Sequence, residues 1–339
     1  MQASNDIKYP RVLVTGGTGF VGAYIIRELV QRGYAVRATK RAGSRLPFFI
    51  DRQWLDAVEW VDADVLDLTQ LNDAMQQVDA VVHAAAVVSF TADQRRQMYA
   101  VNVQGTANVM NLAIENNIGR MVHLSSVAAL GRTEQGEEVD ENKQWSDSRL
   151  HTHYSISKQM AEMEVWRAMA EGLNAVILNP STVLGYGDWN SSSCAIFRQA
   201  YDGFPWYTDG INGFVAVEDL AAITVDMLET DVTMERYIVS GDNWTFRQLF
   251  TEIAGAFGKK PPHRKASAWM GALAWRLEKL RSLFSGKKPL LTRETARVAR
   301  SKTYFSAKKI LDLLPHRRFT ALDKAIRDSA AAYQRQLLH

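Results

Sequence analysis

The 339-residue sequence has a single cysteine, Cys194, so it can form neither an internal disulfide nor a cysteine-based metal cluster. It also has no apolar run near the length of a membrane span, and the polar residues 1–6 lack the apolar centre of a signal peptide. We therefore expect a cytoplasmic protein without a bound metal, in which Cys194 is a small packing residue.

A strong net charge is absent as well, since 40 Lys and Arg face 37 Asp and Glu. This balance hides a basic segment, because residues 259–318 hold 17 basic side chains against three acidic ones. Such a segment suits an anionic substrate, a membrane surface or nucleic acid, and it also suits solvated helix faces. We expect solvated faces, with a small-molecule substrate and no nucleic acid as partner.

The most informative stretch is a glycine-rich turn. Residues 12–22 read V-L-V-T-G-G-T-G-F-V-G and lie between an apolar predicted strand and a predicted helix over residues 23–32. Gly16 allows a sharp turn, Gly19 lets backbone N–H groups approach a pyrophosphate, and Gly22 lets the helix pack on the strand. The turn therefore predicts a dinucleotide site formed by Thr15, Gly16, Gly19, Phe20, Val21 and Gly22.

The end of the second predicted strand, residues 35–39, bears on the choice of cofactor. An NAD site usually has a carboxylate here for the ribose 2′-hydroxyl, but the sequence from residue 37 reads R-A-T-K-R, and no acid follows before Asp51. Cations suit a 2′-phosphate. Arg37, Lys40 and Arg41 therefore favour NADP(H), with NAD(H) as the alternative.

Two further predicted strands, residues 58–61 and 78–82, end where a dinucleotide would lie. An acid after the first can bond the adenine amino group, and small residues after the second let the cofactor lie against the strand end. The predicted cofactor contacts here are Asp64, Val65, Ala84, Ala85 and Ala86.

The candidate catalytic groups follow the fifth predicted strand, residues 120–124. Ser125 and Ser126 stand at its carboxyl end, where open parallel sheets bind ligands. Tyr154 and Lys158 are one helical turn apart, so the phenol and the ammonium share a face. A nearby cation favours the phenolate, and with Ser126 on the same substrate oxygen these groups can move a proton while a nicotinamide exchanges hydride.

Alternating strands and helices predict an α/β fold: a Rossmann-type, doubly wound parallel sheet with a smaller C-terminal α/β substrate domain. We expect the dinucleotide-binding domain over residues 8–180, with sheet elements returning around 211–240, and substrate-binding residues mainly in 181–335. One long helix is expected over residues 92–116, and a surface loop over 131–152.

Several motifs together resemble the extended short-chain dehydrogenases/reductases, also called the NAD-dependent epimerase/dehydratase family. They are the glycine turn, Asn102, S-S at 125–126, Y-S-I-S-K at 154–158 with Glu162, L-N-P-S-T-V-L-G at 178–185 and F-V-A-V-E-D at 214–219. The resemblance implies that Tyr154 is the general acid/base, that Lys158 lowers its pKa and holds the ribose, and that Ser126 polarises a carbonyl. It also implies a catalytic Asn102, cofactor contacts from Ser125, Tyr154 and Lys158, and a nicotinamide site lined by Pro180, Ser181, Thr182 and Val183.

Departures from the family pattern narrow the chemistry. Dehydratases usually have Asp-Glu after the active hydroxyl residue, and this chain has Val127-Ala128; epimerases commonly have Arg-Pro where this chain has Asn179-Pro180. The sequence looks more like the dihydroflavonol reductase and cinnamoyl-CoA reductase branch, although Gly131 replaces the flavonoid-contacting asparagine. We therefore expect a carbonyl–alcohol oxidoreductase. A nucleotide-sugar epimerase with bound NAD is one alternative, and a cofactor-sensing protein without activity is another.

The C-terminal half is rich in aromatic residues, first in residues 201–209 and then in a predicted helix over 268–284. These aromatics suit an apolar or aromatic substrate, and core packing is the alternative. The basic flanks of the predicted helix leave contact with a membrane surface open. The helices over 92–116 and 154–170 form a dimer interface in many members of the family, so a homodimer is also expected.

Overall fold

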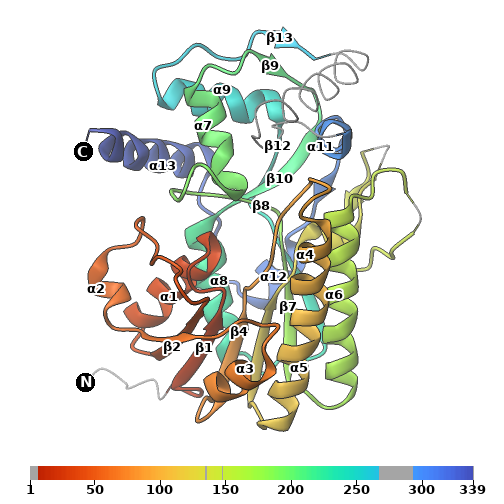
Figure 1. Ribbon diagram of the computed structural model, residues 1–339. Helices are drawn as coiled ribbons and strands as arrows, with labels where there is room; N and C mark the ends of the chain where they lie inside the picture. Colours follow the sequence, from red (N-terminus) through yellow and green to blue (C-terminus); the bar gives the residue numbers. More distant parts are fainter. Residues whose placement is uncertain (1–6, 134–135, 147, 267–292, 339) are drawn as a thin grey trace.

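The computed structural model describes residues 7–133, 136–146, 148–266 and 293–338. Its largest element is a seven-stranded parallel sheet in the order β11-β7-β5-β4-β1-β2-β3 (Figure 1). The order changes direction between β1 and β4, which confirms the predicted doubly wound, Rossmann-type sheet. The strands are β1 Arg11–Thr15, β2 Ala35–Lys40, β3 Glu59–Asp62, β4 Ala80–His83, β5 Arg120–Leu124, β7 Ala175–Pro180 and β11 Glu235–Val239.

Helices cover both faces of this sheet, which explains why its strands are continuously apolar. Val12 and Val14 of β1 pack into one core with α1 and α8, whereas Leu13 points to a second core with α5 and α6. The first face carries α1 Phe20–Gln31, α2 Arg52–Leu55, α8 Val217–Glu229 and α12 Lys308–Leu313; the second carries α3 Leu68–Met75, α4 Arg95–Tyr99, α5 Thr106–Glu115 and α6 His153–Ala170 (Figure 1).

The predicted single helix over residues 92–116 is interrupted. Between α4 and α5 the backbone forms a π-helical segment, Ala100–Gly105, which contains Asn102. Such segments are rare and frequently occur at functional sites. The prediction of one regular helix is therefore wrong at its centre, because an apolar pattern does not distinguish the two hydrogen-bonding patterns.

A smaller lobe lies beyond the carboxyl ends of the large sheet (Figure 1). Its three-stranded sheet has the order β12-β10-β8, and its core surrounds Phe197 and Tyr333, which are almost fully buried. The lobe contains β8 Thr182–Leu184, α7 Ala195–Tyr201, β10 Ile211–Ala216, β12 Asp242–Thr245, α9 Phe246–Ala256, α11 Arg293–Val298 and α13 Leu322–Leu337. Two small sheets pair β9 Trp206–Tyr207 with β13 Arg264–Lys265, and β6 Glu138–Val139 with β14 Tyr304–Phe305.

Only part of the segment 211–240, which was predicted to return to the large sheet, does so. Helix α8 and strand β11 do return to the nucleotide-binding half, whereas β10 belongs to the smaller sheet. The predicted helix over 268–284 lies outside the described residues. Within the described part of the chain, no helix is long and apolar enough to cross a bilayer.

Candidate active site

The glycine turn joins β1 to α1 at the point where the strand order changes direction. Gly16 has a positive φ of 73°, and a Cβ there would lie 2.7 Å from the backbone of Ala85. At Gly22 a Cβ would lie 2.3 Å from the carbonyl oxygen of Gly16, so the helix can approach the turn only without a side chain. Gly19 is the N-cap residue of α1, whose first N–H groups have no acceptor within the helix. The turn therefore fits a dinucleotide pyrophosphate.

A series of buried hydrogen bonds connects the glycine turn to the π-helical segment Ala100–Gly105. The Thr106 hydroxyl donates to the carbonyl oxygen of Asn102 at 2.6 Å, so it accepts from His83 Nε2 at 3.0 Å. His83 Nδ1 consequently accepts from the Thr15 hydroxyl at 2.7 Å. Burial lowers the pKa of His83 to about 3, so the ring is neutral, as these hydrogen bonds require. His83 is thus a positioning residue between the glycine turn and the π-helical segment.

The candidate catalytic side chains converge beyond the end of β5. Ser126 follows the strand and caps the short 3-10 turn Val127–Leu130, with its Oγ accepting from the Ala128 N–H at 3.1 Å. Tyr154 and Lys158 lie on α6, whose N-terminus is fixed by a capping box between Thr152 and Ser155. The Ser126 hydroxyl lies near enough to the phenol of Tyr154 to lower its pKa. The two predicted partners are therefore adjacent.

Burial controls the protonation of both α6 groups. It raises the pKa of Tyr154, and the nearby Ser126 hydroxyl offsets part of this rise. It also lowers the pKa of Lys158 to about 8, against the opposing charge of Glu162. Lys158 Nζ donates to the carbonyl oxygen of Leu124 at 2.9 Å. The pKa of Tyr154 is therefore raised, whereas the resemblance implied that Lys158 lowers it. The phenol is protonated at neutral pH.

A buried polar network lies one helical turn further along α6. Glu162, 3% exposed, accepts hydrogen bonds from Ser125 at 2.7 Å and Asn179 at 2.8 Å, and it forms an ion pair with Arg236 at 3.0 Å. Ser125 was predicted as a cofactor contact, but its hydroxyl is bonded to this carboxylate. Asn179 and Arg236 were not among the predicted site residues. The only sequence signal was the one-turn spacing that places Lys158 and Glu162 on one face of α6.

Asn102 has a different position from the one expected of a catalytic group. Its amide oxygen accepts from the Val87 N–H at 2.7 Å, and its amide nitrogen donates to the Val87 carbonyl and to Ser157, each at 3.0 Å. With both ends bonded to the protein, Asn102 is a positioning residue that holds the loop after β4 to α6.

The predicted cofactor residues of β2, Arg37 and Lys40, have different surroundings in the structure. Arg37 donates to the carbonyl oxygens of Ala74 and Gln76 and pairs with Glu59, so its guanidinium stabilises the end of α3. Its prediction as a cofactor contact is corrected accordingly. Lys40 lies at the carboxyl end but forms an ion pair with Asp62, its register partner on β3. An acid is thus present at this edge, on the neighbouring strand.

The remaining predicted cofactor residues lie at the same edge of the sheet. Asp64 and Val65 follow β3, and the alanines at 84–86 follow β4, where Ala85 N donates to the Thr15 hydroxyl at 3.3 Å. The side chain of Phe20 packs against Tyr24 and Phe49. Pro180 ends β7, and Thr182 and Val183 begin β8. Between the two strands, Ser181 has a buried hydroxyl without a hydrogen-bond partner among the described residues.

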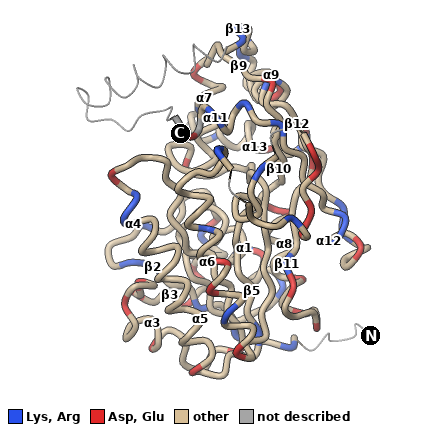
Figure 2. Tube along the Cα trace, turned by 90° about the vertical axis from the view of Figure 1, so that its right-hand side faces the viewer, with Lys and Arg blue, Asp and Glu red and all other residues tan. Residues whose placement is uncertain are grey.

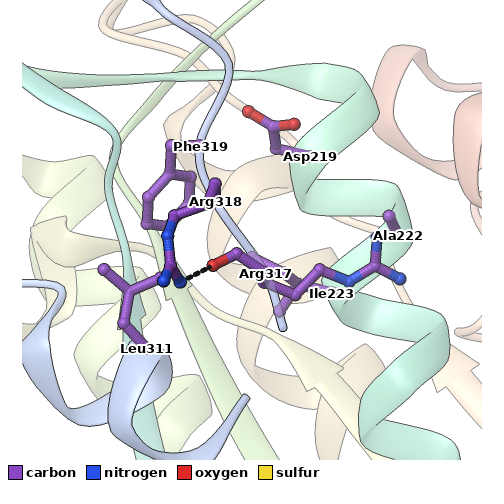
Figure 3. A pocket seen from close by; sticks show the side chains of 7 residues that line it. All are labelled: Asp219, Ala222, Ile223, Leu311, Arg317, Arg318 and Phe319. Atoms are coloured by element: carbon purple, nitrogen blue, oxygen red, sulfur yellow. Dashed lines mark hydrogen bonds between the residues drawn. The ribbon is translucent and has the colours of Figure 1, made fainter. Parts of the chain in front are cut away.

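Two other places are not part of this site. The pocket drawn in Figure 3 lies between α8 and the segment from Leu311 to Phe319; its volume is about 20 Å³, enough for one water. Cys194 is almost fully buried, and burial raises the pKa of its thiol to about 12, which makes it unreactive, as expected of a packing residue. The described residues contain no cluster of His, Cys, Asp or Glu arranged for a metal.

A parallel sheet with a glycine turn where its strand order changes direction is typical of dinucleotide-dependent enzymes. The sequence pattern of the NAD dependent epimerase/dehydratase family matches residues 12–240. The chain belongs to this family, the extended short-chain dehydrogenases/reductases, and it is an NAD(P)-dependent enzyme.

Individual relatives are similar to this chain over most of its length. A putative dihydroflavonol 4-reductase from Synechocystis sp. is 32% identical over 308 residues, covering 89% of this chain and 88% of the relative. Cinnamoyl-CoA reductase 1 from Petunia hybrida is 30% identical over 240 residues, covering 67% of this chain and 71% of the relative.

Solved structures agree with this fold. The structure of gox2253 has a TM-score of 0.81 at 30% identity, covering 96% of this chain and 98% of that chain. A Thermus thermophilus UDP-glucose 4-epimerase in complex with NAD has a TM-score of 0.74 at 21% identity, covering 96% and 99%. The second similarity shows the fold alone.

Proposed function

We propose that this enzyme is an NADP(H)-dependent oxidoreductase that interconverts a carbonyl group and an alcohol, with Ser126, Tyr154 and Lys158 as its catalytic residues. The observation that carries the proposal is the proximity of the Ser126 hydroxyl to the partly buried Tyr154, which lies one helical turn before Lys158. The named reductases among the relatives support the same chemistry. When bound, the dinucleotide supplies or accepts the hydride.

Each side chain has a distinct role in this proposal. The Ser126 hydroxyl orients the substrate oxygen, and the Tyr154 phenol donates the proton that this oxygen needs when a carbonyl becomes an alcohol. Because burial raises the pKa of Tyr154, the phenol holds its proton at neutral pH, and this favours the direction of reduction. Lys158, fixed on the carbonyl oxygen of Leu124, keeps a positive charge near the site below about pH 8.

The NADP(H) preference rests on the edge formed by β2 and β3. Arg41 is exposed there, and among the described residues no carboxylate pairs with it. Lys40 stands beside it in the ion pair with Asp62. A 2′-phosphate would gain two cations at this edge, whereas a 2′-hydroxyl needs only an acceptor.

The direct experiment follows NADPH oxidation with a panel of aromatic and aliphatic aldehydes, ketones and acyl-CoA thioesters. We expect turnover of at least one class, a loss of about 100-fold or more in kcat for Tyr154→Phe, and no loss for Tyr9→Phe at the opposite end of the sheet. No turnover of any carbonyl would overturn the proposal.

A nucleotide-sugar epimerase with tightly held NAD is the second candidate. The carboxylate of Asp62 at the β2–β3 edge favours it, since an acid there can accept a hydrogen bond from a ribose hydroxyl. Denaturing the purified protein and identifying the released nucleotide separates the two: released NAD that does not exchange with free NADPH would favour the epimerase.

A homodimer through α4, α5 and α6 is also proposed. Met160 and Met163 on α6 are 41% and 56% exposed, so this helix presents apolar side chains to solvent. Size-exclusion chromatography with light scattering tests it, and conversion to a monomer by Met163→Glu would support this interface.

A further inference from the structure

Arg132 is a partly buried cation on the substrate side of the candidate site that the proposed roles do not use. It follows the short turn that begins at Ser126, and the preceding Gly131 faces His151 and Trp145. One Nη1–H of Arg132 donates to Asn212 Oδ1 at 3.0 Å, and Asn212 Nδ2 donates to Thr182 Oγ1 at 2.8 Å. Two hydrogen bonds thus join this guanidinium to the predicted nicotinamide-lining run.

The charge of Arg132 has no counter-ion among the described residues. Its partner Asn212 is a neutral amide, and among the described residues no carboxylate forms an ion pair with it. Burial lowers the pKa of Arg132 to about 10, so the guanidinium remains charged at neutral pH. A partly buried, unpaired cation is unfavourable, and a bound anion would remove that penalty.

The free edge of the guanidinium has the geometry of an oxyanion site. Since Nη1 is bonded to Asn212, Nε and Nη2 remain, and neither has a hydrogen-bond partner among the described residues. Two parallel N–H donors on one planar edge match the two oxygens of a carboxylate or a phosphate.

The surroundings are positively charged as well. A cavity of about 240 Å³ is lined by Lys265, Arg300 and Lys302 together with Asp209, which pairs with Lys265. Lys302 links this cavity to the residue after Arg132, because the Thr133 hydroxyl donates to the carbonyl oxygen of Lys302 at 3.5 Å. Lysine and arginine positions gather around β13, β10 and α11 (Figure 2). Such a potential favours an anion over a neutral ligand.

From this arrangement we infer that Arg132 binds an oxyanion of the substrate, and that the substrate carries a carboxylate or phosphate group beside its reacting carbonyl. The inference rests on the proposed function, because it assumes that a carbonyl approaches Tyr154. Lys265, Arg300 and Lys302 of the basic segment 259–318 only add positive potential near this site.

Binding measurements test this without requiring turnover. Titration calorimetry on the full-length protein, with and without NADP⁺, compares benzoate, its neutral analogue benzamide, and phenyl phosphate. We expect one of the two anions to bind about tenfold or more tightly than benzamide. Arg132→Gln should abolish this preference, Arg132→Lys should keep part of it, and Arg96→Gln, an exposed control, should keep all of it. The tighter anion identifies carboxylate or phosphate as the recognised group.

A second variant guards against misfolding of the first. Asn212→Asp places a carboxylate next to the retained guanidinium, so it should also remove the anion preference, while circular dichroism and melting curves check the fold of every variant. Equal binding of all three probes by the wild type, or a preference that survives in Arg132→Gln, would overturn the inference.

The outcome is distinguishable from failure of the proposed function. If no carbonyl is reduced but the anions still bind through Arg132, the oxidoreductase proposal fails and the oxyanion site stands. If carbonyls are reduced, phenylglyoxylate and its methyl ester provide the second readout: Arg132→Gln should raise KM for the acid alone, and equal effects on acid and ester would contradict the inference.

Discussion

Ser125 and Ser126 are consecutive in the chain, yet their hydroxyls face different groups: Ser125 donates to the buried carboxylate of Glu162, and Ser126 lies beside the phenol of Tyr154. The extended end of β5 causes this, because successive side chains of a strand point to opposite sides. One serine therefore belongs to the framework and the other to the candidate chemistry.

Alanine substitutions should separate the two serines. Ser126→Ala should lower kcat by about 100-fold, because an oriented hydroxyl is lost from the reacting oxygen, and loss of its cap on the Ala128 N–H should lower the free energy of unfolding by only about 0.5–1 kcal/mol. Ser125→Ala should instead lower the free energy of unfolding by about 2 kcal/mol, since a hydrogen bond to a buried charge is lost. Steady-state kinetics and chemical denaturation measure both, and identical profiles for the two variants would refute the assignment.

The pH dependence of reduction should report Lys158. Because burial lowers the pKa of this ammonium to about 8, kcat/KM should fall above about pH 8 as the charge is lost. Glu162 opposes that shift, so Glu162→Gln should move the falling limb to lower pH. Glu164→Gln, a more exposed acid on the same helix, serves as control and should leave the limb in place. A limb that stays at the same pH in Glu162→Gln would contradict this electrostatic coupling.

Two glycine-to-alanine changes should act on different quantities: one should lower dinucleotide affinity, and the other should raise stability. In Gly22→Ala the new Cβ would lie 2.3 Å from the Gly16 carbonyl oxygen, so the turn must shift and dinucleotide affinity should fall at least tenfold. In Gly255→Ala, on α9, the Cβ meets no atom within 4 Å, and helix propensity should add about 0.5–1 kcal/mol to stability. Fluorescence titration and thermal melting test the pair; unchanged affinity in Gly22→Ala would count against the cofactor role of the turn.

Cofactor preference should depend on two cations at the β2 end. The double variant Lys40→Asp with Arg41→Ala should lower the ratio of kcat/KM for NADPH over NADH at least tenfold, because the 2′-phosphate loses both charges and meets a carboxylate. Arg37→Gln is the control: its guanidinium holds the end of α3, so it should reduce stability and leave the ratio unchanged. An unaltered ratio in the double variant would remove the NADP(H) assignment.

Acid should destabilise the protein through its buried histidines. The pKa of His83 in the folded chain is about 3, below the ordinary value of 6.5, so the unfolded chain binds more protons between these values and stability falls as pH drops below 6.5. At pH 5 this group alone should remove about 2 kcal/mol.

His123 adds to this effect. Burial also lowers its pKa, and neither ring nitrogen has a hydrogen-bond partner among the described residues. His123→Leu should therefore lose less stability than the wild type between pH 7.5 and 5 in urea denaturation. An equal or greater loss would show that His123 is protonated in the folded state.

The parts that could be predicted from sequence are those in which one local pattern determines both structure and chemistry. The glycine turn, the strands and the one-turn spacing from Tyr154 to Lys158 depend on neighbouring residues, and the structure has them as expected. The family pattern over residues 12–240 is consistent with this.

What could not be predicted depends on contacts between distant segments. Lys40 meets Asp62 only through the register of β2 and β3, and Arg132 meets Asn212 across 80 residues. The π-helical segment is invisible in an apolar pattern, and Arg37 looked like a cofactor ligand because sequence does not tell toward which end of a strand a long side chain extends. Burial, which also needs the fold, reversed the expected pKa shift of Tyr154.

The chain passes between the two lobes several times. Strands β8 and β10 belong to the three-stranded sheet, α8 and β11 belong to the half with the large sheet, and α13 packs in the core of the smaller lobe. No single cut in the backbone therefore yields a self-sufficient nucleotide-binding fragment, since truncation after Pro180 would strip α8 and an edge strand from it. Recombining this chain with a relative to swap specificity would require several crossover points, and a single-junction chimera should misfold.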